Sequence, residues 1–146
     1  NYNLIISGSD KNNFKKIKKK VDNYNLNNNI LMPGYIDESI MKYLYTNAKA
    51  LVYPTLIGPT NIPPLEAISY NCPVICSNIY GMPEQLKDSV YYINPLSVKE
   101  IANAMVEIDK NHEIRNELLS KGQSIIKQRS YETFKDSYYK IIDQLQ

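Results

Sequence analysis

The chain has 146 residues, enough for one domain with a buried core, and 43% of them are hydrophobic against 22% charged. Its 17 basic and 15 acidic side chains leave a formal charge of +2, so no strong field is available to attract nucleic acid. No apolar run approaches the roughly 20 residues of a membrane-spanning helix, and the first residues lack a signal-peptide pattern. We therefore expect a cytosolic protein whose partners are recognised by a local site.

Short apolar runs alternate with longer segments of helical periodicity, an order that predicts parallel strands joined by helices. The expected strands cover residues 3–9, 29–35, 49–54, 72–78 and 89–95. The expected helices cover residues 11–24, a segment starting at Asp37, a short segment ending before Asn71, a segment starting at Ser97, residues 112–128 and a segment after Ser130. The sequence thus predicts an α/β fold with a Rossmann-like parallel sheet flanked by helices, and it shows no internal domain boundary.

Capping residues mark several of the expected helix ends. Asp37 is suited to the start of a helix, and Ser97 with Glu100 forms a capping-box pattern. Asn71 lies where the short helix must stop, because asparagine tolerates the left-handed conformation of a C-cap.

The carboxyl ends of parallel strands meet at one edge of the sheet, and ligands of such folds bind at that edge. The loops expected there contain residues 8–9, 34–36, 54–62, 78–83 and 94–95. Residues 55–62 form a longer connection than a strand and a helix usually need, which favours a function for this loop.

The stretch GPTNIPPLEA, residues 58–67, combines two prolines with one acid. Proline suits the first position of a helix, so Pro63 or Pro64 predicts a helix start. The free amides of the first turn, at residues 64–66, would then face the sheet edge at the positive end of the helix dipole, where phosphate binds. Two interpretations of Glu66 remain open: its carboxylate complements the dipole, or it accepts hydrogen bonds from two sugar hydroxyls.

Residues 50–86, ALVYPTLIGPTNIPPLEAISYNCPVICSNIYGMPEQL, resemble the donor-binding segment of family 4 glycosyltransferases. These are retaining, nucleotide-sugar-dependent enzymes with the GT-B fold of two Rossmann-like halves. Glu66 matches the second acid of the family's Glu-x7-Glu motif, and Gly58 stands at the position of the first. The similarity runs through the whole chain in the order of the family's carboxyl-terminal domain.

The resemblance implies that the chain binds a nucleotide-diphosphate sugar without a cofactor or a metal ion. Glu66 would hold the ribose hydroxyls of the nucleotide. The backbone from Thr60 to Ile62 and the amide of Leu65 would contact the sugar and the diphosphate. Tyr35 and Ile36 would line the site of the base.

The motif's first acid contacts the donor sugar in that family. Gly58 has no side chain for this task, and we expect Asn61 to substitute for the acid in part. The resemblance identifies no catalytic residue in this chain.

The resemblance also implies that residues 1–146 are the donor-binding domain of an enzyme that transfers a sugar to a glycan or a lipid-linked acceptor. The family's domain begins one strand and one helix earlier, with an Arg and a Lys that neutralise the diphosphate, and catalysis needs a second, acceptor-binding half. We therefore expect a piece of a longer enzyme. It should bind a nucleotide sugar weakly, and its sheet should have a gap or its oligomeric state should be unusual.

Two other functions remain open. A nucleotide-sugar epimerase of the same fold would need a histidine near the cleft, and His112 is badly placed for that role. A non-catalytic domain that binds a nucleotide sugar or a partner protein is compatible with Gly58 and with the missing basic pair.

The basic run at residues 15–20 has two interpretations. It forms the solvated face of a helix whose Phe14, Ile17 and Val21 point inward, or it contacts anionic lipid at the inner face of the membrane. The residues concerned are Lys15, Lys16, Lys18, Lys19 and Lys20. Cys72 and Cys76 are expected to be buried thiols, because their spacing fits neither a disulfide nor a zinc site.

Overall fold

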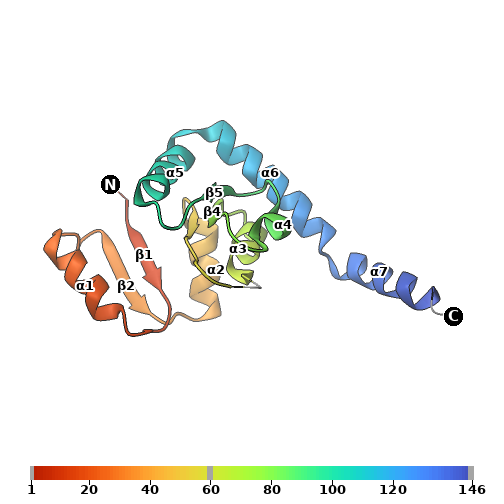
Figure 1. Ribbon diagram of the computed structural model, residues 1–146, viewed down its shortest axis with the longest axis horizontal. Helices are drawn as coiled ribbons and strands as arrows, with labels where there is room; N and C mark the ends of the chain where they lie inside the picture. The colour runs from red at the N-terminus through yellow and green to blue at the C-terminus, as the bar shows by residue number, and fades with distance from the viewer. Residues whose placement is uncertain (1, 59–60, 145–146) are drawn as a thin grey trace. The chain divides into compact units, whose positions relative to one another are not determined.

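The computed structural model describes residues 2–58 and 61–144, which form five strands and seven helices (Figure 1). In chain order they are β1 (Leu4–Ser7), α1 (Phe14–Asn23), β2 (Ile30–Gly34), α2 (Glu38–Asn47), β3 (Leu51–Tyr53), α3 (Ile62–Ser69), β4 (Val74–Ser77), α4 (Met82–Leu86), β5 (Tyr91–Ile93), α5 (Val98–Lys110), α6 (His112–Gln128) and α7 (Tyr131–Asp143). All five expected strands are present, and every pair is parallel. The predicted α/β class is confirmed.

The chain divides into two compact units, Asn1–Lys42 and Tyr43–Gln146, with the boundary inside helix α2. This boundary was not predicted from the sequence, which was expected to form a single unit. The strands form two sheets, a two-stranded one in the order β1-β2 and a three-stranded one in the order β3-β4-β5. No strand pair among the described residues joins the two sheets.

Unit 1 consists of the β1-β2 pair, helix α1 and the start of α2. Helix α1 begins at Phe14 rather than at residue 11, because the Asp10 carboxylate accepts a hydrogen bond from the Phe14 amide. Val21 is buried as predicted, but Phe14 and Ile17 are 41% and 37% exposed, so the expectation that all three point inward was wrong for these two. A ten-residue helix over two strands has too small a covering surface to bury them.

Unit 2 is built around strand β4, whose four residues are all buried between β3 and β5. Helix α5 and helix α6 close one side of this sheet, and their side chains meet those of β4 and β5 in a continuous apolar core. The core residues are Ile75, Ile93, Ala104, Ile108 and Leu118. Burial of this cluster supplies the main driving force for folding unit 2.

Helix α6 packs closely against helix α3, because its Gly122 has no side chain. A Cβ atom at Gly122 would lie 2.7 Å from the Cγ2 atom of Ile68. Next to it, the Gln123 side chain donates to the Ile68 carbonyl at 3.0 Å and to the Asn71 side chain at 2.8 Å. This contact fixes the end of α3, where Asn71 adopts the predicted left-handed conformation with φ of 58°.

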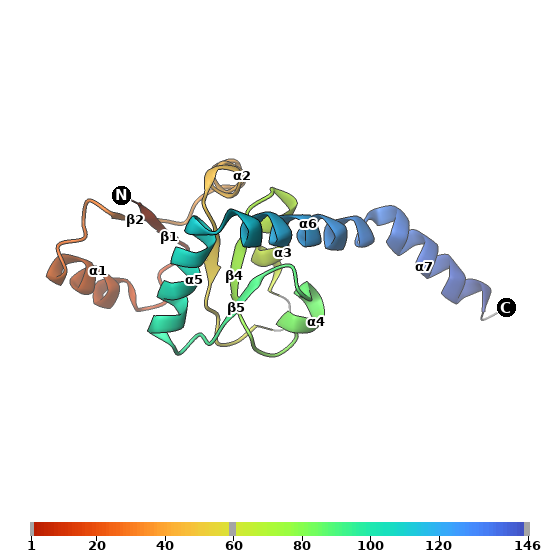
Figure 2. The same cartoon turned by 90° about the horizontal axis from the view of Figure 1, so that it is seen from above.

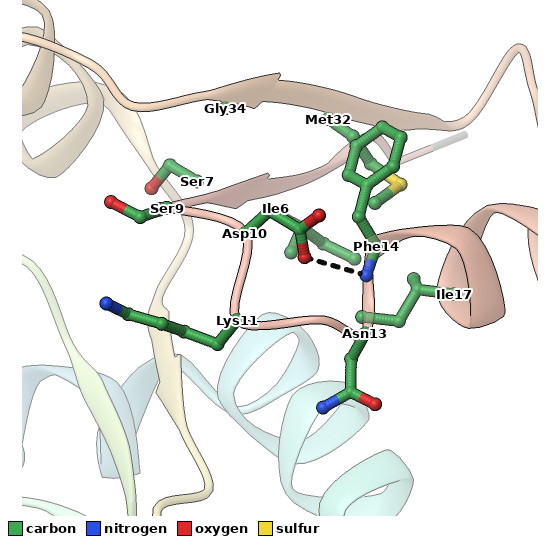
Figure 3. A pocket seen from close by; sticks show the side chains of 11 residues that line it. Ile6, Ser7, Ser9, Asp10, Lys11, Asn13, Phe14, Ile17, Met32 and Gly34 are labelled. Atoms are coloured by element: carbon green, nitrogen blue, oxygen red, sulfur yellow. Dashed lines mark hydrogen bonds between the residues drawn. The ribbon is translucent and has the colours of Figure 1, made fainter.

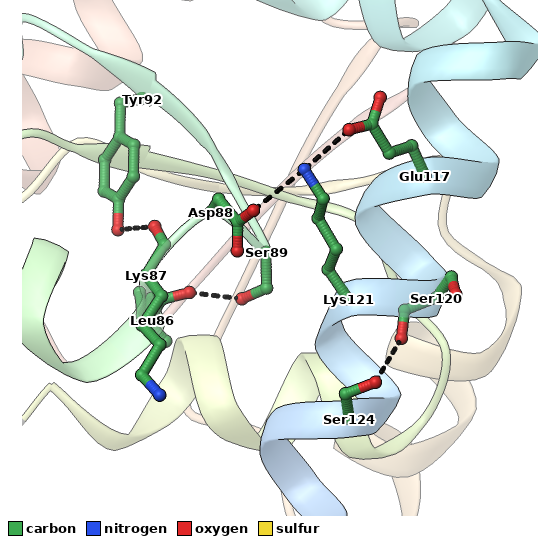
Figure 4. Close-up of polar contacts among 9 residues, drawn as sticks. All are labelled: Leu86, Lys87, Asp88, Ser89, Tyr92, Glu117, Ser120, Lys121 and Ser124. Atoms are coloured by element: carbon green, nitrogen blue, oxygen red, sulfur yellow. Dashed lines mark hydrogen bonds and ion pairs between the residues drawn. The ribbon is translucent and has the colours of Figure 1, made fainter.

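An ion-pair network ties the loop before β5 to helix α6 (Figure 4). The Lys121 ammonium lies 2.9 Å from the Asp88 carboxylate and 2.6 Å from the Glu117 carboxylate. The hydrogen bond from Lys121 lowers the pKa of Asp88, and the two carboxylates raise the pKa of Lys121. Because all three groups are partly or largely exposed, this network orients the loop more than it stabilises the fold.

The starts of α2 and α5 test two of the capping predictions. The Asp37 carboxylate accepts from the Ile40 amide at 2.9 Å, and the Ser97 hydroxyl accepts from the Glu100 amide at 3.2 Å. The reciprocal half of the capping box was wrong: the Ser97 amide already donates to the Asn94 carbonyl, and the Glu100 carboxylate accepts from the Asn94 amide instead. Helix α4 was not among the helices expected from the sequence.

Helix α7 begins after Ser130 as predicted, and it buries none of its described residues. In both views it continues beyond α6, away from the three-stranded sheet of unit 2 (Figure 2). Its large apolar side chains are 36% to 73% exposed: Tyr131, Phe134, Tyr138, Tyr139, Ile141 and Ile142. Among the described helices, none is both long enough and apolar enough to cross a membrane.

Candidate functional site

The loop between β3 and α3 lies at the carboxyl edge of the three-stranded sheet, as the strand order predicts. Of the residues proposed to bind a donor, Gly58, Thr60 and Asn61 fall in this loop, and the others on this unit fall in the following helix α3. Thr60 lies outside the described residues, so its expected contact with the donor stays a prediction. Of the others, Ile62 is exposed and Leu65 is half-buried.

Helix α3 starts at Ile62, with Asn61 as N-cap and the two prolines directly after the first helical residue. The predicted start is thus confirmed. The expectation of free amides at residues 64–66 needs a correction, because Pro64, like Pro63, has no N–H group. This helix end therefore offers fewer backbone donors to an anion than an ordinary one.

The side chain of Asn61 does not cap its own helix. Its Oδ1 atom accepts a hydrogen bond from the Tyr53 hydroxyl at 3.1 Å, and its Nδ2 group donates to the Gly58 carbonyl. Its carbonyl accepts a long bond of 3.5 Å from the Gln85 side chain. Asn61 is therefore held between strand β3, the loop and helix α4.

Gly58, at the position of the motif's first acid, lies directly beside the Asn61 side chain. A Cβ atom at Gly58 would lie 2.8 Å from the Asn61 Cγ atom, closer than side chains approach. The Asn61 carboxamide thus takes the space in which the side chain of an acid at position 58 would begin. Asn61 and a side chain at position 58 would therefore compete for one space, and the role of Asn61 toward a donor stays a prediction.

Glu66 is exposed on helix α3, and one of its oxygens, Oε2, accepts a hydrogen bond from the Tyr45 hydroxyl at 3.4 Å. Tyr45 itself is only 6% exposed. Burial, reinforced by the negative charge of Glu66, raises the pKa of Tyr45 to about 12, so the phenol keeps its proton at neutral pH. This contact joins two positions 21 residues apart and was not predicted from the sequence.

Tyr35 and Ile36, expected to line the base site, follow strand β2 and belong to unit 1. Tyr35 is 81% exposed, whereas Ile36 is 9% exposed and contributes to the core. The other predicted donor residues belong to unit 2. A shared site for the two groups therefore stays a prediction.

Two cavities lie at the carboxyl edges of the sheets, each within one unit. In unit 1 a cavity of about 210 Å³ opens over the ends of β1 and β2, and Gly8, Ser9 and Gly34 contribute to its lining (Figure 3). In unit 2 a cavity of about 240 Å³ lies between the loops after β4 and β5, lined in part by Asn78 and Asn94. The predicted edge loops thus line both cavities, but neither Glu66 nor Asn61 does.

The part of the chain that the structure describes includes two cysteines and one histidine. That part contains no group of three or more His, Cys, Asp or Glu residues able to hold a metal ion. Cys72 and Cys76 are buried free thiols, as predicted, and burial raises the pKa of each to about 11. A protonated buried thiol is a poor nucleophile.

The chain is similar to known proteins in sequence and in fold. A family model described as "Glycosyl transferases group 1" matches residues 1–125. The O-antigen chain mannosyltransferase B of Escherichia coli is 31% identical over 99 residues, which are 68% of this chain and 26% of that protein. The O-antigen chain mannosyltransferase RfbU of Salmonella typhimurium is 32% identical over 109 residues, 75% of this chain and 31% of that protein.

Among solved structures, HepE of Anabaena in complex with UDP and glucose has a TM-score of 0.80 to this chain. The match has 15% sequence identity and covers 97% of this chain and 40% of that one, so it supports the fold alone. The chain spans between a quarter and a third of the length of the two curated relatives.

Proposed function

The chain belongs to the family of group 1 glycosyl transferases, and on that premise we propose that it binds the nucleotide-diphosphate sugar of a sugar-transfer reaction. The acceptor would be a glycan or a lipid-linked sugar. The observation that carries the proposal is the family match through residues 1–125, which includes Asn61 and, on helix α3, Glu66. The names of the two mannosyltransferase relatives support a hexose as the transferred sugar.

Glu66 would bind the nucleotide through its ribose. A carboxylate accepts hydrogen bonds from two neighbouring hydroxyl groups, and each bond to a charged group contributes about 1.5 to 3 kcal/mol before ordering costs. The exposure of Glu66 leaves its second oxygen, Oε1, available for such a contact. The amide of Leu65 and the backbone from Thr60 to Ile62 would contact the diphosphate and the sugar.

Asn61 would contact the transferred sugar in place of the motif's first acid. Its carboxamide is held by the Tyr53 hydroxyl and the Gly58 carbonyl, so the group is positioned before a ligand arrives. A neutral amide, however, lacks the charge of the acid that other family members use. This difference supports a second candidate, a domain that binds a nucleotide sugar without catalysing its transfer.

The affinity should be low. Micromolar binding requires about 8 kcal/mol. The end of α3 contributes at most about 2 kcal/mol, and Pro63 and Pro64 remove two of its donors. We expect a dissociation constant well above the micromolar range for the 146-residue chain, and tight binding in calorimetry would contradict this.

Saturation-transfer NMR with UDP- and GDP-linked hexoses tests the proposal. Transfer to at least one of these ligands is expected, and it should be lost when Glu66 is replaced with glutamine. Glu113→Gln is the matched control, because Glu113 is also an exposed acid near the start of a helix but lies on α6. Equal transfer for wild type and Glu66→Gln would leave Glu66 as a dipole-complementing residue and would refute the assignment.

A separate part of the proposal concerns the lysines of α1 and contact with a membrane. All five are exposed, and Lys18 pairs with Asp22 at 3.3 Å. We propose that they hold the chain at an anionic membrane surface, where many lipid-linked acceptors are found. Sedimentation with liposomes rich in phosphatidylglycerol at low and high salt tests this, and recovery of all protein in the supernatant at low salt would leave the lysines as a solvated helix face.

The epimerase alternative gains no support from His112. This residue is exposed at the first position of α6 and lines neither of the two cavities.

A further inference from the structure

Tyr45 occupies an unusual position for a polar aromatic residue, since its ring is buried while its hydroxyl faces an exposed acid. The ring stacks on that of Tyr70, with 6.1 Å between the ring centroids and 19° between the ring planes. Stacked aromatic rings restrict each other's rotation. The Tyr70 ring, at the end of helix α3, therefore holds the Tyr45 ring in position.

The same helix carries the acid. Glu66 lies on α3 and Tyr70, four residues later, is its C-cap residue, so their side chains lie on one face of the helix. Tyr70 supports the ring of Tyr45, and Glu66 accepts the hydrogen bond from its hydroxyl at 3.4 Å. Tyr45 of helix α2 thus contacts both Glu66 and Tyr70.

The hydroxyl of Tyr45 acts as a donor throughout the physiological pH range. Burial and the charge of Glu66 keep its pKa near 12, so it has a proton to donate. One oxygen of Glu66 is therefore occupied by the phenol. The other oxygen, Oε1, is left for a ligand. Its direction is restricted because the phenol holds the same carboxylate at Oε2.

We propose that Tyr45 is a positioning residue for the donor site: its phenol fixes one oxygen of Glu66 so that the other meets the ribose hydroxyls of the nucleotide. This inference rests on the proposed function. It makes a distinct claim, however. If Tyr45 acts through Glu66, the effect of removing its hydroxyl on binding depends on the ribose hydroxyls of the nucleotide, whereas a purely structural effect is the same with and without them.

The test measures binding of UDP and GDP to the 146-residue chain, each compared with its 2′,3′-dideoxy analogue. Tyr45→Phe keeps the stacked ring and removes only the hydroxyl. It should weaken binding of the preferred ribonucleotide about three- to tenfold, the range of one hydrogen bond, and leave the dideoxy analogue unchanged. Tyr43→Phe, on the same helix with a 67% exposed ring, is the matched control and should change neither.

A double substitution separates an effect through Glu66 from an additive one. In the Glu66→Gln background, Tyr45→Phe should weaken binding no further, because the carboxylate it positions is gone. A second readout needs no nucleotide: Glu66→Gln should lower the pKa of the Tyr45 phenol, followed by NMR of labelled tyrosine rings.

The outcomes distinguish the inference from the proposed function. If neither UDP nor GDP binds to the wild type, the proposed function fails and the inference fails with it. If a ribonucleotide binds but Tyr45→Phe behaves as wild type, weakens both analogues equally or adds to Glu66→Gln, only the inference is overturned. An unchanged Tyr45 pKa in Glu66→Gln would also overturn it, because the two groups would then not be in contact.

Discussion

Replacing Gly122 with alanine should destabilise the packing of α6 on α3. The new Cβ atom would lie 2.7 Å from the Ile68 Cγ2 atom, while ordinary contact begins at 3.4 Å, so the helices must separate by about 0.7 Å or Ile68 must move. Ile68 is 4% exposed, and its β-branched side chain has one favoured rotamer in a helix. The neighbouring Gln123 side chain also holds α6 to the end of α3.

Two opposing effects decide the size of this change. Alanine gains about 1 kcal/mol over glycine in a helix interior, whereas overpacking a core costs about 1 to 3 kcal/mol. Because Ile68 is stiff and α6 is anchored, we expect the steric cost to exceed the gain by about 1 to 2 kcal/mol. For a chain of this size, that lowers the melting temperature by about 3 to 6 °C.

Thermal and urea unfolding followed by circular dichroism measure the effect. Ser120→Ala, an exposed position of the same helix, is the control and should be neutral or slightly stabilising. In an Ile68→Leu background, which lacks the Cγ2 methyl group, Gly122→Ala should cost less than in the wild type. A melting temperature equal to or above that of the wild type would refute the reasoning and show that Ile68 yields easily.

Three further predictions follow from burial and capping. Cys72 and Cys76 should resist alkylation in the folded chain and react at once in urea, because their burial keeps the thiols protonated; rapid labelling of the native chain, read by mass spectrometry, would contradict this. The raised pKa of Tyr45 should contribute to stability in full below about pH 10, and this contribution should be lost between about pH 10 and pH 12, because the unfolded state ionises first. Urea unfolding at about pH 9 and about pH 11 measures this, and Tyr45→Phe should reduce the fall. Ser97→Ala should cost about 1 kcal/mol of global stability, because α5 contributes to the core. Ser130→Ala should leave the global unfolding midpoint unchanged, because α7 buries none of its described residues; equal shifts for both variants would show that α7 folds with the core.

Local features of the sequence predicted the elements well, because their signals are short-range. Alternating apolar runs located all five strands, and the left-handed tolerance of Asn71 located the end of α3. Helix α4 was missed because five residues carry no helical period, although Pro83 near its start was a usable signal. The exposure of Phe14 was also missed, since a sequence pattern shows which face is apolar but not how much surface covers it.

The residues proposed for the candidate site stay a prediction, and the contacts that they make were not predicted. The motif identified Glu66 and Gly58 by position. The hydrogen bond from Tyr45 to Glu66 joins two helices, and no periodicity predicts which side chains meet across such a contact. Likewise, the competition of Asn61 and a side chain at position 58 for one space became visible only with the loop in three dimensions.

The uncovered helix α7 has a practical consequence for handling the protein. A 13-residue helix that buries none of its described residues is only marginally stable in water, so its backbone opens often enough for a protease to bind. Trypsin has two lysines to cleave there, Lys135 and Lys140, while lysines on α5 and α6 belong to helices anchored in the core. Brief digestion should therefore trim the chain from its carboxyl end and leave the three-stranded sheet and its covering helices intact.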